Sequence, residues 1–529
     1  MLEKKTSSLV TMVLGVALAS FSYAADAAPT FTKDVAPIFH SKCTECHRPG
    51  EIAPMSLLTF EEARPWAKSI AKNVAAGEMP PWKLNPEHGT FSNDMSLTQE
   101  EIDTIVDWVD AGAQRGKRSD MPKIPKYTDG WRNGKPDYVI ELDEIAVTAD
   151  GADFFPNIEI EMDLPEDKWI RAIEFRPGNR QVLHHVVTFL GGGTSAATSL
   201  PDFLAVWAPG TPPAVYPEGT GRKIGKNETI TMNMHYHSYG EAATDQTRVG
   251  LYFADKEPEK AISGQFAGTV NFRIPANEKD YQVNGRYVVD ENIQVIAYFP
   301  HMHTRGKSMK YTATYPDGKS EVLLDVAEYD FNWQWYYYPE EPVTLPEGTI
   351  LDIEARFDNS ADNPNNPNPN MDVIFGEGTD SEMMFGVFDF IAVDGKYPKP
   401  IDITEKLERV LSTYDSDTAF QVTVDVGPLN LKSGFIVPKE GDGLWYLPFG
   451  RQLFELPLSE IEWTGNSFTA DITLLGAGGI SMAGTVAADG TVEGTFDIGE
   501  FDVRELGGLD PKSFAGAQFE KATGTKDSD

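Results

Sequence analysis

The sequence predicts a mainly β protein that carries a small α-helical domain near its N-terminus. Three observations lead to this fold class. The 529 residues are too many for one core and predict about three or four domains. Apolar residues recur at helical spacing in the first part of the chain. From Asp137 onward, short β-branched and aromatic runs alternate with turn signals, which is typical of β-sandwiches or barrels.

The N-terminus has the composition of a signal peptide, which we place at residues 1–24. Lys4 and Lys5 precede an apolar run over residues 9–19, and Ser22-Tyr23-Ala24 is a small-x-small cleavage site. We therefore expect a periplasmic or secreted protein. Later apolar runs fall short of the roughly 20 residues that cross a bilayer, so we expect no membrane span in the mature chain.

Net charge and cysteine content argue against two classes of protein. The chain has 45 basic and 81 acidic residues, and binding to phosphates needs clustered Lys and Arg, so we expect no nucleic-acid partner. An acidic surface favours solubility or the docking of a basic protein. The two cysteines, Cys43 and Cys46, belong to one motif, which excludes a framework of disulfide bonds.

The motif Cys43-Thr44-Glu45-Cys46-His47 has the CxxCH spacing of a covalently attached haem c. At this spacing two thioether bonds fix one haem, and the following histidine ligates its iron. A zinc site would need two more cysteine or histidine ligands nearby. We therefore expect Cys43, Cys46 and His47 to bind one haem.

The residues around this motif predict the helices of a small cytochrome c domain, residues 30–115. Thr59 with Glu62, and Thr98 with Glu101, both fit a capping box at the start of a helix. Apolar residues at helical spacing follow the second box. These helices are the ones that a small cytochrome needs.

A thioether is expected as the sixth ligand of the iron. Met55, Met79 and Met95 are the candidates. Residues 77–82 resemble the axial-methionine loop of class I c-type cytochromes, and this resemblance favours Met79. Met55 stays an alternative.

The rest of the chain divides into a linker and three β-rich parts. Residues 116–136 are rich in Lys, Pro, Gly and Asp and predict the linker. We expect two β-domains at 137–256 and 257–395. Residues 396–529 predict a further β-rich domain of unknown role, which contains no histidine or cysteine.

Histidines cluster in the two central β-domains. Six of the nine histidines form three tight groups, which random placement would seldom produce. The groups are His184 with His185, His235 with His237, and His301 with His303. Residues i and i+2 of a strand project from the same face, so His301 and His303 can converge on one metal ion.

Four segments, 183–189, 234–236, 301–304 and 381–383, occur in the order and rough spacing of the type II copper, ascorbate-dependent monooxygenases. This family includes the peptidylglycine α-hydroxylating and dopamine β-monooxygenases. The resemblance covers about residues 137–395 and implies two jelly-roll-like sandwiches that face each other across a cleft, each holding one copper ion.

Carried over residue by residue, the resemblance implies two ligand sets. An electron-transfer copper would bind His184, His185 and His235, and an oxygen-activating copper would bind His301, His303 and Met383.

The chemistry of the ligands supports this assignment. A thioether is soft and prefers Cu(I), so a His-His-Met set suits the reduced ion that meets dioxygen. A histidine-only set can deliver the second electron that a hydroxylation needs. Met384 adjoins Met383, and the match of the preceding glutamate favours Met383.

Two points about the histidines stay open. Neighbouring residues of a regular strand point to opposite faces, so His184 and His185 can share one ion only with a bulge or twist. His237 could replace His235, because both lie on one strand face. The family pattern favours His235.

The chain departs from this family where the substrate binds. The arginine that holds a peptide carboxylate, two residues before the HxH pair, is here Phe299. Polar residues after the methionine are replaced by Phe385 and Val387. We therefore expect an uncharged or apolar small-molecule substrate. The aromatic run at 333–338 predicts core packing on a strand, with a substrate cleft as the alternative.

Together these inferences predict an exported haem- and copper-dependent monooxygenase that uses O2 to hydroxylate a C–H bond of a small organic substrate. The haem would relay electrons from an external donor, either a redox protein or a small reductant. The alternative is a non-oxygenating periplasmic electron-transfer protein, or a multidomain cytochrome that binds copper or a glycan. Two coppers per chain would indicate the oxygenase, and haem alone the carrier.

Overall fold

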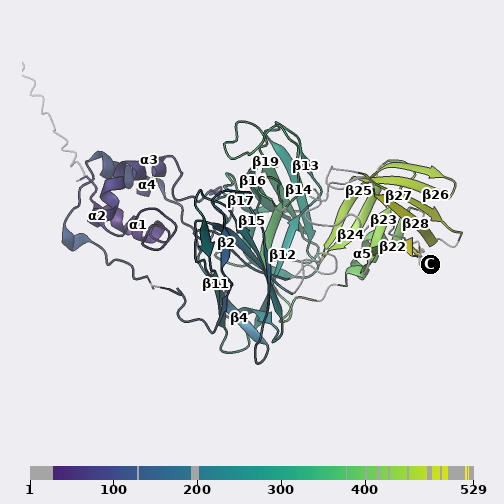
Figure 1. Cartoon of the computed structure of the whole chain (residues 1–529), viewed down its shortest axis with the longest axis horizontal. Coiled ribbons are helices and arrows are strands. Elements are labelled where there is room, and N and C mark those ends of the chain that lie inside the picture. Colours follow the sequence, from purple (N-terminus) through teal and green to yellow (C-terminus); the bar gives the residue numbers. More distant parts are fainter. Residues whose placement is uncertain are drawn as a thin grey trace, which may run out of the picture.

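The computed structural model shows an elongated molecule with helices at one end and β-sheets over the rest (Figure 1). It confirms the predicted fold class, mainly β with a few helices near the start. The expected signal peptide, residues 1–24, lies outside the described residues. None of the helices within the described ranges is both long and apolar enough to cross a bilayer. The structure describes residues 28–127, 130–191, 202–376, 378–399, 402–412, 414, 418–426, 429–441, 443–449, 452–473, 479–488, 491–498, 519–520 and 522–523.

The N-terminal part is a small helical unit. Its elements are η1 (Phe31–Val35), α1 (Ala36–Lys42), α2 (Phe60–Ala63), η2 (Arg64–Trp66), α3 (Ala67–Ala75), α4 (Gln99–Asp110) and η3 (Arg118–Asp120). Both predicted capping boxes are confirmed, at Thr59 before α2 and at Thr98 before α4. Phe31, Phe39 and Trp108 pack edge to face or tilted in its core, so one aromatic cluster holds the helices together.

A first β-sandwich follows. Its strands are β1 (Tyr138–Glu141), β2 (Ile145–Val147), β3 (Asn157–Glu161), β4 (Lys168–Arg176), β5 (Leu183–Leu190), β6 (Asp202–Trp207), β7 (Ala214–Val215), β8 (Thr220–Ile224), β9 (Thr229–Tyr236), β10 (Ala243–Asp245) and β11 (Arg248–Phe253). Strands β1-β11-β4-β8 form one layer and β3-β9-β5-β6 the other. Their inner faces share one apolar core, as expected for a sandwich.

A second sandwich is built in the same way. Its strands are β12 (Lys260–Gly268), β13 (Arg273–Ile274), β14 (Tyr281–Val288), β15 (Ile293–His301), β16 (Gly306–Thr314), β17 (Ser320–Val326), β18 (Val343–Leu345), β19 (Ile350–Phe357), β20 (Val373–Ile374) and β21 (Phe385–Ala392). The layer β12-β21-β15-β18 packs on β14-β19-β16-β17 around a separate core. A short parallel pairing of β12 with β8 joins the two sandwiches edge to edge.

The C-terminal part is a closed β-barrel with one helix. Its elements are α5 (Ile403–Leu411), β22 (Ala419–Val426), β23 (Leu429–Ile436), β24 (Gly443–Phe449), β25 (Gln452–Thr464), β26 (Ser467–Thr473), β27 (Gly479–Val486), β28 (Thr491–Ile498), β29 (Phe519–Glu520) and β30 (Ala522–Thr523). Strands β22 to β28 pair in sequence order. Because β29 pairs with β22 and β30 with β28, the last segment closes the sheet.

Helix α5 was missed by the sequence prediction, which expected a β-rich domain over residues 396–529. Asp402 caps its first turn by accepting backbone N–H bonds from Thr404 and Glu405. Leu407 and Leu411, one turn apart, are fully buried against the barrel. A nine-residue helix gives a short periodic signal, so the surrounding strand pattern dominated the prediction.

The helical part is joined to the second sandwich by the segment between α3 and α4. Leu84 forms a β-bridge with Val326, and Phe91 contributes its ring to the core of the second sandwich. The side-chain amide of Asn93 donates to the carbonyl of Tyr336 at 2.8 Å. These contacts attach the helical part to the second sandwich.

Candidate metal centre

The candidate site lies where the β9-β5-β6 layer of the first sandwich meets the β12-β21-β15 layer of the second. His185 is on β5 and His235 on β9, directly opposite each other in the antiparallel register. His301 ends β15. The rings of His185 and His301 are 5.9 Å apart, so the two sandwiches bring their histidines together.

The first group consists of His184, His185 and His235, whose candidate ligand atoms all lie within 4.8 Å of one another. The register of β5 against β9 shifts between Leu183 and His185. This irregularity confirms the expected bulge, and it turns two adjacent histidines toward the same place.

Three ring nitrogens converge in this group. The Nδ1 atom of His185 lies 3.2 Å from that of His184 and 3.4 Å from that of His235. Two nitrogens bound tetrahedrally at about 2.0 Å from one ion would lie about 3.3 Å apart. A hydrogen on the central nitrogen can satisfy at most one of these two contacts, whereas one ion would bind all three nitrogens.

Asp153 determines which nitrogen of His235 is free. Its carboxylate accepts a hydrogen bond from Nε2 of His235 at 2.8 Å, so Nδ1 keeps its lone pair and faces the group. Burial alone would raise the pKa of Asp153, but the hydrogen bonds from His235 and Thr379 lower it to about 2. Asp153 therefore remains a carboxylate at neutral pH.

His237 lies apart from this group. Its Nε2 is 2.7 Å from the carbonyl of Gln181 in an exposed position, and its ring is 6.1 Å from that of His184. His235, by contrast, is 1% exposed. The structure thus brings His235, and not His237, to the adjacent pair.

The second group contains His301 and His303, whose rings are 5.3 Å apart. The side-chain amide of Gln334 donates through Nε2 to the carbonyl of Phe331 at 2.9 Å. Its Oε1 therefore accepts from Nδ1 of His301, at 2.7 Å. Nδ1 of His303 donates to the carbonyl of Ser381 at 3.1 Å. Both rings consequently present Nε2 with a free lone pair.

We expect the neighbouring side chains of Met383 and Met384 to face different sides of the chain. Met302 and Met384 are fully buried in the core of the second sandwich. Side chains alternate along an extended chain, so the residues that flank them, His301, His303 and Met383, project to the opposite side. From this alternation we expect Met383 on the side of the histidines.

Glu382 connects these two segments. Its carboxylate accepts the backbone N–H of His303 at 2.8 Å and that of Arg305 at 2.6 Å. Burial raises the pKa of Glu382 to about 7, against the lowering effect of these two donors. The side chain next to Met383 thus fixes the backbone that carries His303.

At physiological pH the rings of His184, His185, His301 and His303 are neutral. Burial, followed by the proximity of His235, lowers the pKa of His184 to about 3. Burial lowers the pKa of His301 to about 4 and the pKa values of His185 and His303 well below the ordinary value. Neutral imidazole is the form that binds metals.

Phe331 lies between the two groups. Its ring stacks on His184 at 4.6 Å and meets the edge of His303 at 5.9 Å. The aromatic run that follows, residues 333–338, is not the regular strand that we expected. It forms one bridge, between Tyr337 and Tyr298, and packs into the cores around it.

The CxxCH motif follows α1 at the end of the helical part nearest the sandwiches. Burial raises the pKa of the Cys43 thiol to about 12 and that of Cys46 to about 11, which disfavours the thiolates that a metal ion needs. Nδ1 of His47 donates to the carbonyl of Met55 at 3.2 Å, leaving Nε2 free. Met79 is 41% exposed.

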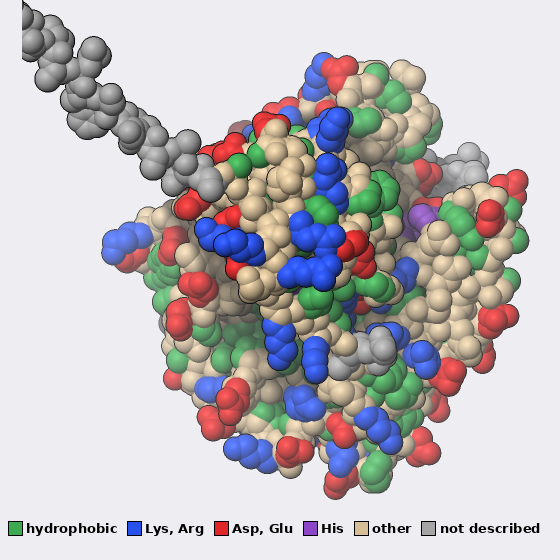
Figure 2. Space-filling model, turned by 90° about the vertical axis from the view of Figure 1, so that its left-hand side faces the viewer, with side chains coloured by type: hydrophobic (Ala, Val, Ile, Leu, Met, Phe, Trp, Pro, Cys, Tyr) green, Lys and Arg blue, Asp and Glu red, His purple; other side chains and the backbone are tan. Residues whose placement is uncertain are grey.

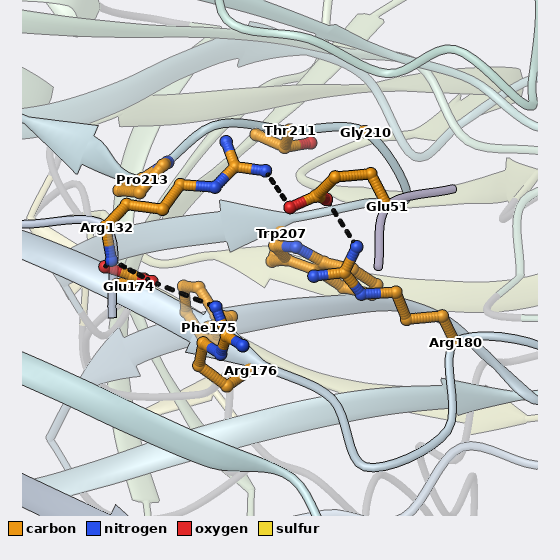
Figure 3. Close-up of a pocket in the computed structure, with 10 residues that line it drawn as sticks. All are labelled: Glu51, Arg132, Glu174, Phe175, Arg176, Arg180, Trp207, Gly210, Thr211 and Pro213. Carbon is orange, nitrogen blue, oxygen red and sulfur yellow. Dashed lines mark hydrogen bonds and ion pairs between the residues drawn. The ribbon is translucent and has the colours of Figure 1, made fainter. Parts of the chain in front are cut away.

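A small polar cavity of about 10 Å³, room for a single water molecule, lies between this motif and the first sandwich (Figure 3). Glu51 projects into it from the helical part and pairs with Arg132 at 2.8 Å and Arg180 at 2.6 Å. A Cβ on Gly210 would lie 3.6 Å from Sγ of Cys46 and 3.5 Å from the ring of Trp333. Gly210 of the first sandwich therefore lies close to both Cys46 and Trp333.

Sequence reasoning missed the residues that orient the histidines. Asp153, Gln334 and Phe331 belong to no motif, and Glu382 entered the prediction only as a neighbour of Met383. Asp153 is 82 positions from His235, and Gln334 is 33 positions from His301. No local pattern could have indicated these pairings.

Comparison with known proteins gives a partial match to a monooxygenase. No protein-family model matches the chain. Part of the chain is similar to the peptidyl-glycine alpha-amidating monooxygenase of Mus musculus, with 24% identity over 242 residues, covering 42% of this chain and 24% of that protein. The chain thus spans about a quarter of the length of this relative.

Among solved structures, a chain of the infectious bursal disease virus Gx strain covers 52% of this chain and 88% of its own length, at 8% identity and a TM-score of 0.14, and carries no argument. The sequence similarity to a monooxygenase extends over less than half of the chain.

Proposed function

We propose that the protein is an exported copper-dependent monooxygenase that hydroxylates a C–H bond of a small organic substrate. One atom of O2 enters the C–H bond and the other leaves as water, while an external donor supplies two electrons and two protons. The observation that carries this proposal is the meeting of two histidine groups, one from each sandwich, with their free nitrogens turned inward. Similarity to a monooxygenase supports it.

The donor atoms fit two copper ions of different character. Nδ1 of His184, His185 and His235 would hold one ion in a set of imidazoles alone. Nε2 of His301 and His303, with the sulfur of Met383, would hold the other in a softer set that suits Cu(I). Copper bound in these places would supply the one-electron steps of an O2-dependent hydroxylation.

The protein's own residues prepare these sets before any ion binds. Asp153 and Gln334 each take the hydrogen of one ring nitrogen, so that the other nitrogen of His235 or His301 stays free. Burial lowers the pKa values of His184, His185, His301 and His303, which favours their neutral rings. Phe331 covers His184 and His303 with one apolar ring, which limits the access of water to both sets.

We further propose that Cys43 and Cys46 would hold haem c through thioether bonds, and that Nε2 of His47 would ligate its iron. Such a haem would supply an electron-transfer centre. The hydrogen bond between His47 and Met55 favours Met79 over Met55 as the sixth ligand. Met55 is held beside Nδ1 of His47, on the side of the ring that faces away from Nε2, whereas no hydrogen bond between described residues ties Met79 to that side.

An external electron donor would dock on the helical part. Figure 2 looks onto this end of the molecule, where several Lys and Arg side chains follow one another across the face. The exposed residues of this unit include Arg64, Trp66 and Lys68. Against a net charge of −36 for the whole chain, a basic face would direct an acidic redox protein to this unit.

Metal analysis of the protein purified from the periplasm tests the proposal. We expect two coppers and one haem iron per chain, and O2 uptake with an uncharged substrate. Replacing His47 should slow turnover with a protein donor but spare turnover driven by ascorbate. Haem without copper, and no O2 uptake with any substrate, would contradict the proposal. Equal loss with both donors would contradict the electron relay.

A further inference from the structure

Apolar side chains continue from His301 across the same face of the second sandwich. In the register of β15 with β21, His301 lies opposite Phe385 and Phe299 opposite Val387. In the register of β21 with β12, Val387 lies opposite Phe266. Residues paired in this way share one face of the sheet. The metal-binding edge of this face is thus continuous with an aromatic surface.

The rings of this surface contact one another and the histidine. Phe385 lies 6.4 Å from His301 with the ring planes 24° apart. Phe266 and Phe375 meet Phe385 at 5.0 Å and 5.8 Å. These three phenylalanines are only partly buried. Large rings that stay partly exposed beside a group of buried polar residues mark a binding surface.

The C-terminal barrel borders this surface. Phe454, on β25, lies 6.1 Å from Phe266, and β24 and β25 occupy the side of the barrel that faces the second sandwich (Figure 1). An ion pair between Lys406 of α5 and Asp290, at 3.1 Å and largely shielded from solvent, fixes the barrel there. The barrel is therefore a wall of the surface and not a tethered appendage.

The charge of this face is neutralised. Asp389, one pair further along β21, forms a buried ion pair with Arg222 of the first sandwich at 2.5 Å. Both partners are thus already engaged, and a charged ligand on the phenylalanines would lose its hydration without gaining a partner. An uncharged ligand carries no such hydration and would not incur this cost.

We propose that Phe266, Phe375, Phe385 and Phe454 form the binding site of an uncharged aromatic substrate, and that the C-terminal barrel completes this site. This inference rests on the proposed function, because the contact of Phe385 with His301 makes these rings a substrate site only if His301 takes part in the reaction. The binding of an aromatic molecule can be measured whether or not the protein turns it over.

Equilibrium dialysis of the full-length, metal-loaded protein against naphthalene, with 2-naphthoate as the charged analogue, tests this inference. We expect naphthalene to bind at least tenfold more tightly than 2-naphthoate. Phe385→Ala and Phe454→Ala should each weaken naphthalene binding about tenfold, which corresponds to about 1.4 kcal/mol. Tyr397→Ala, at an aromatic residue that is 48% exposed and packs on Trp169 of the first sandwich, should leave binding unchanged.

Phe454→Leu, which keeps an apolar side chain in the barrel, guards against a loss caused by unfolding, and each variant is compared by its thermal melt. Weaker binding in Phe454→Leu with a wild-type melt supports the role of the barrel. Wild-type binding in both Phe454 variants overturns that role, and wild-type binding in Phe385→Ala overturns the site. Naphthalene binding without O2 uptake would contradict the proposed function but not this site.

Discussion

Asp153 links the two histidine groups, and its replacement gives the sharpest test of how the first group is built. Its carboxylate accepts from Nε2 of His235 and from the hydroxyl of Thr379, in the loop that leads to Met383. A hydrogen bond to a charged partner contributes about 1.5–3 kcal/mol. Removing it should lower the copper affinity of the first group about 10- to 100-fold, the usual effect of such a partner.

The affinity can be measured by titrating the reduced protein with Cu(I) in competition with a chromophoric chelator. We expect Asp153→Ala to weaken one of two binding steps, and Asp153→Asn to weaken it less, because the amide keeps an acceptor but loses the charge. Asp150→Asn, at an exposed neighbour, is the matched control. Two unchanged binding steps in Asp153→Ala, or an equal loss in both, would refute the assignment of Asp153 to His235.

Three further predictions concern the second group and the metals. Gln334→Leu leaves the Nδ1–H of His301 buried without an acceptor, at a cost of about 1–3 kcal/mol, and should weaken the other copper step about tenfold, whereas Gln334→Glu should restore it. Met383→Leu should remove that step and leave the melting temperature of the metal-free protein unchanged. Met384→Leu, in the core, should leave copper binding unchanged and lower the stability by less than about 1.5 kcal/mol, measured by urea unfolding. Removing copper with a chelator should lower the melting temperature measured by scanning calorimetry. The reason is that an ion at a hundredfold excess over its Kd stabilises the native state by about 2.7 kcal/mol. Equal melting temperatures for the copper-loaded and copper-free protein would contradict this prediction.

The sequence predicted those features that depend on residues close together in the chain. The capping boxes at Thr59 and Thr98 span four residues each and were confirmed. The spacing of His301 and His303 predicted a shared face, and their rings do lie together. The bulge at His184 and His185 could be expected because two adjacent side chains had to turn the same way.

Features that depend on distant pairings could not be predicted. The meeting of His185 with His301 depends on how two sandwiches pack, which no strand pattern specifies. The barrel is closed by its last described segment, β29 and β30, against strands that begin at Ala419 and Thr491. The position of Phe454 against Phe266 follows from this closure and from the docking of α5.

At Met383 and Met384, a shift of one residue decides which side chain lies in the core and which faces the histidines. Met384 is buried in the same core as Met302, and from this burial we expect Met383, one position away, to face the histidines. A slip of one position would exchange every side chain between core and site, moving Met383 into the core and Met384 toward His303. The fully buried Met302 and Met384 therefore act as a pair of anchors that set the register on both segments. If copper binding were lost in Met384→Leu and kept in Met383→Leu, this register would be wrong, and with it the assignment of the second group.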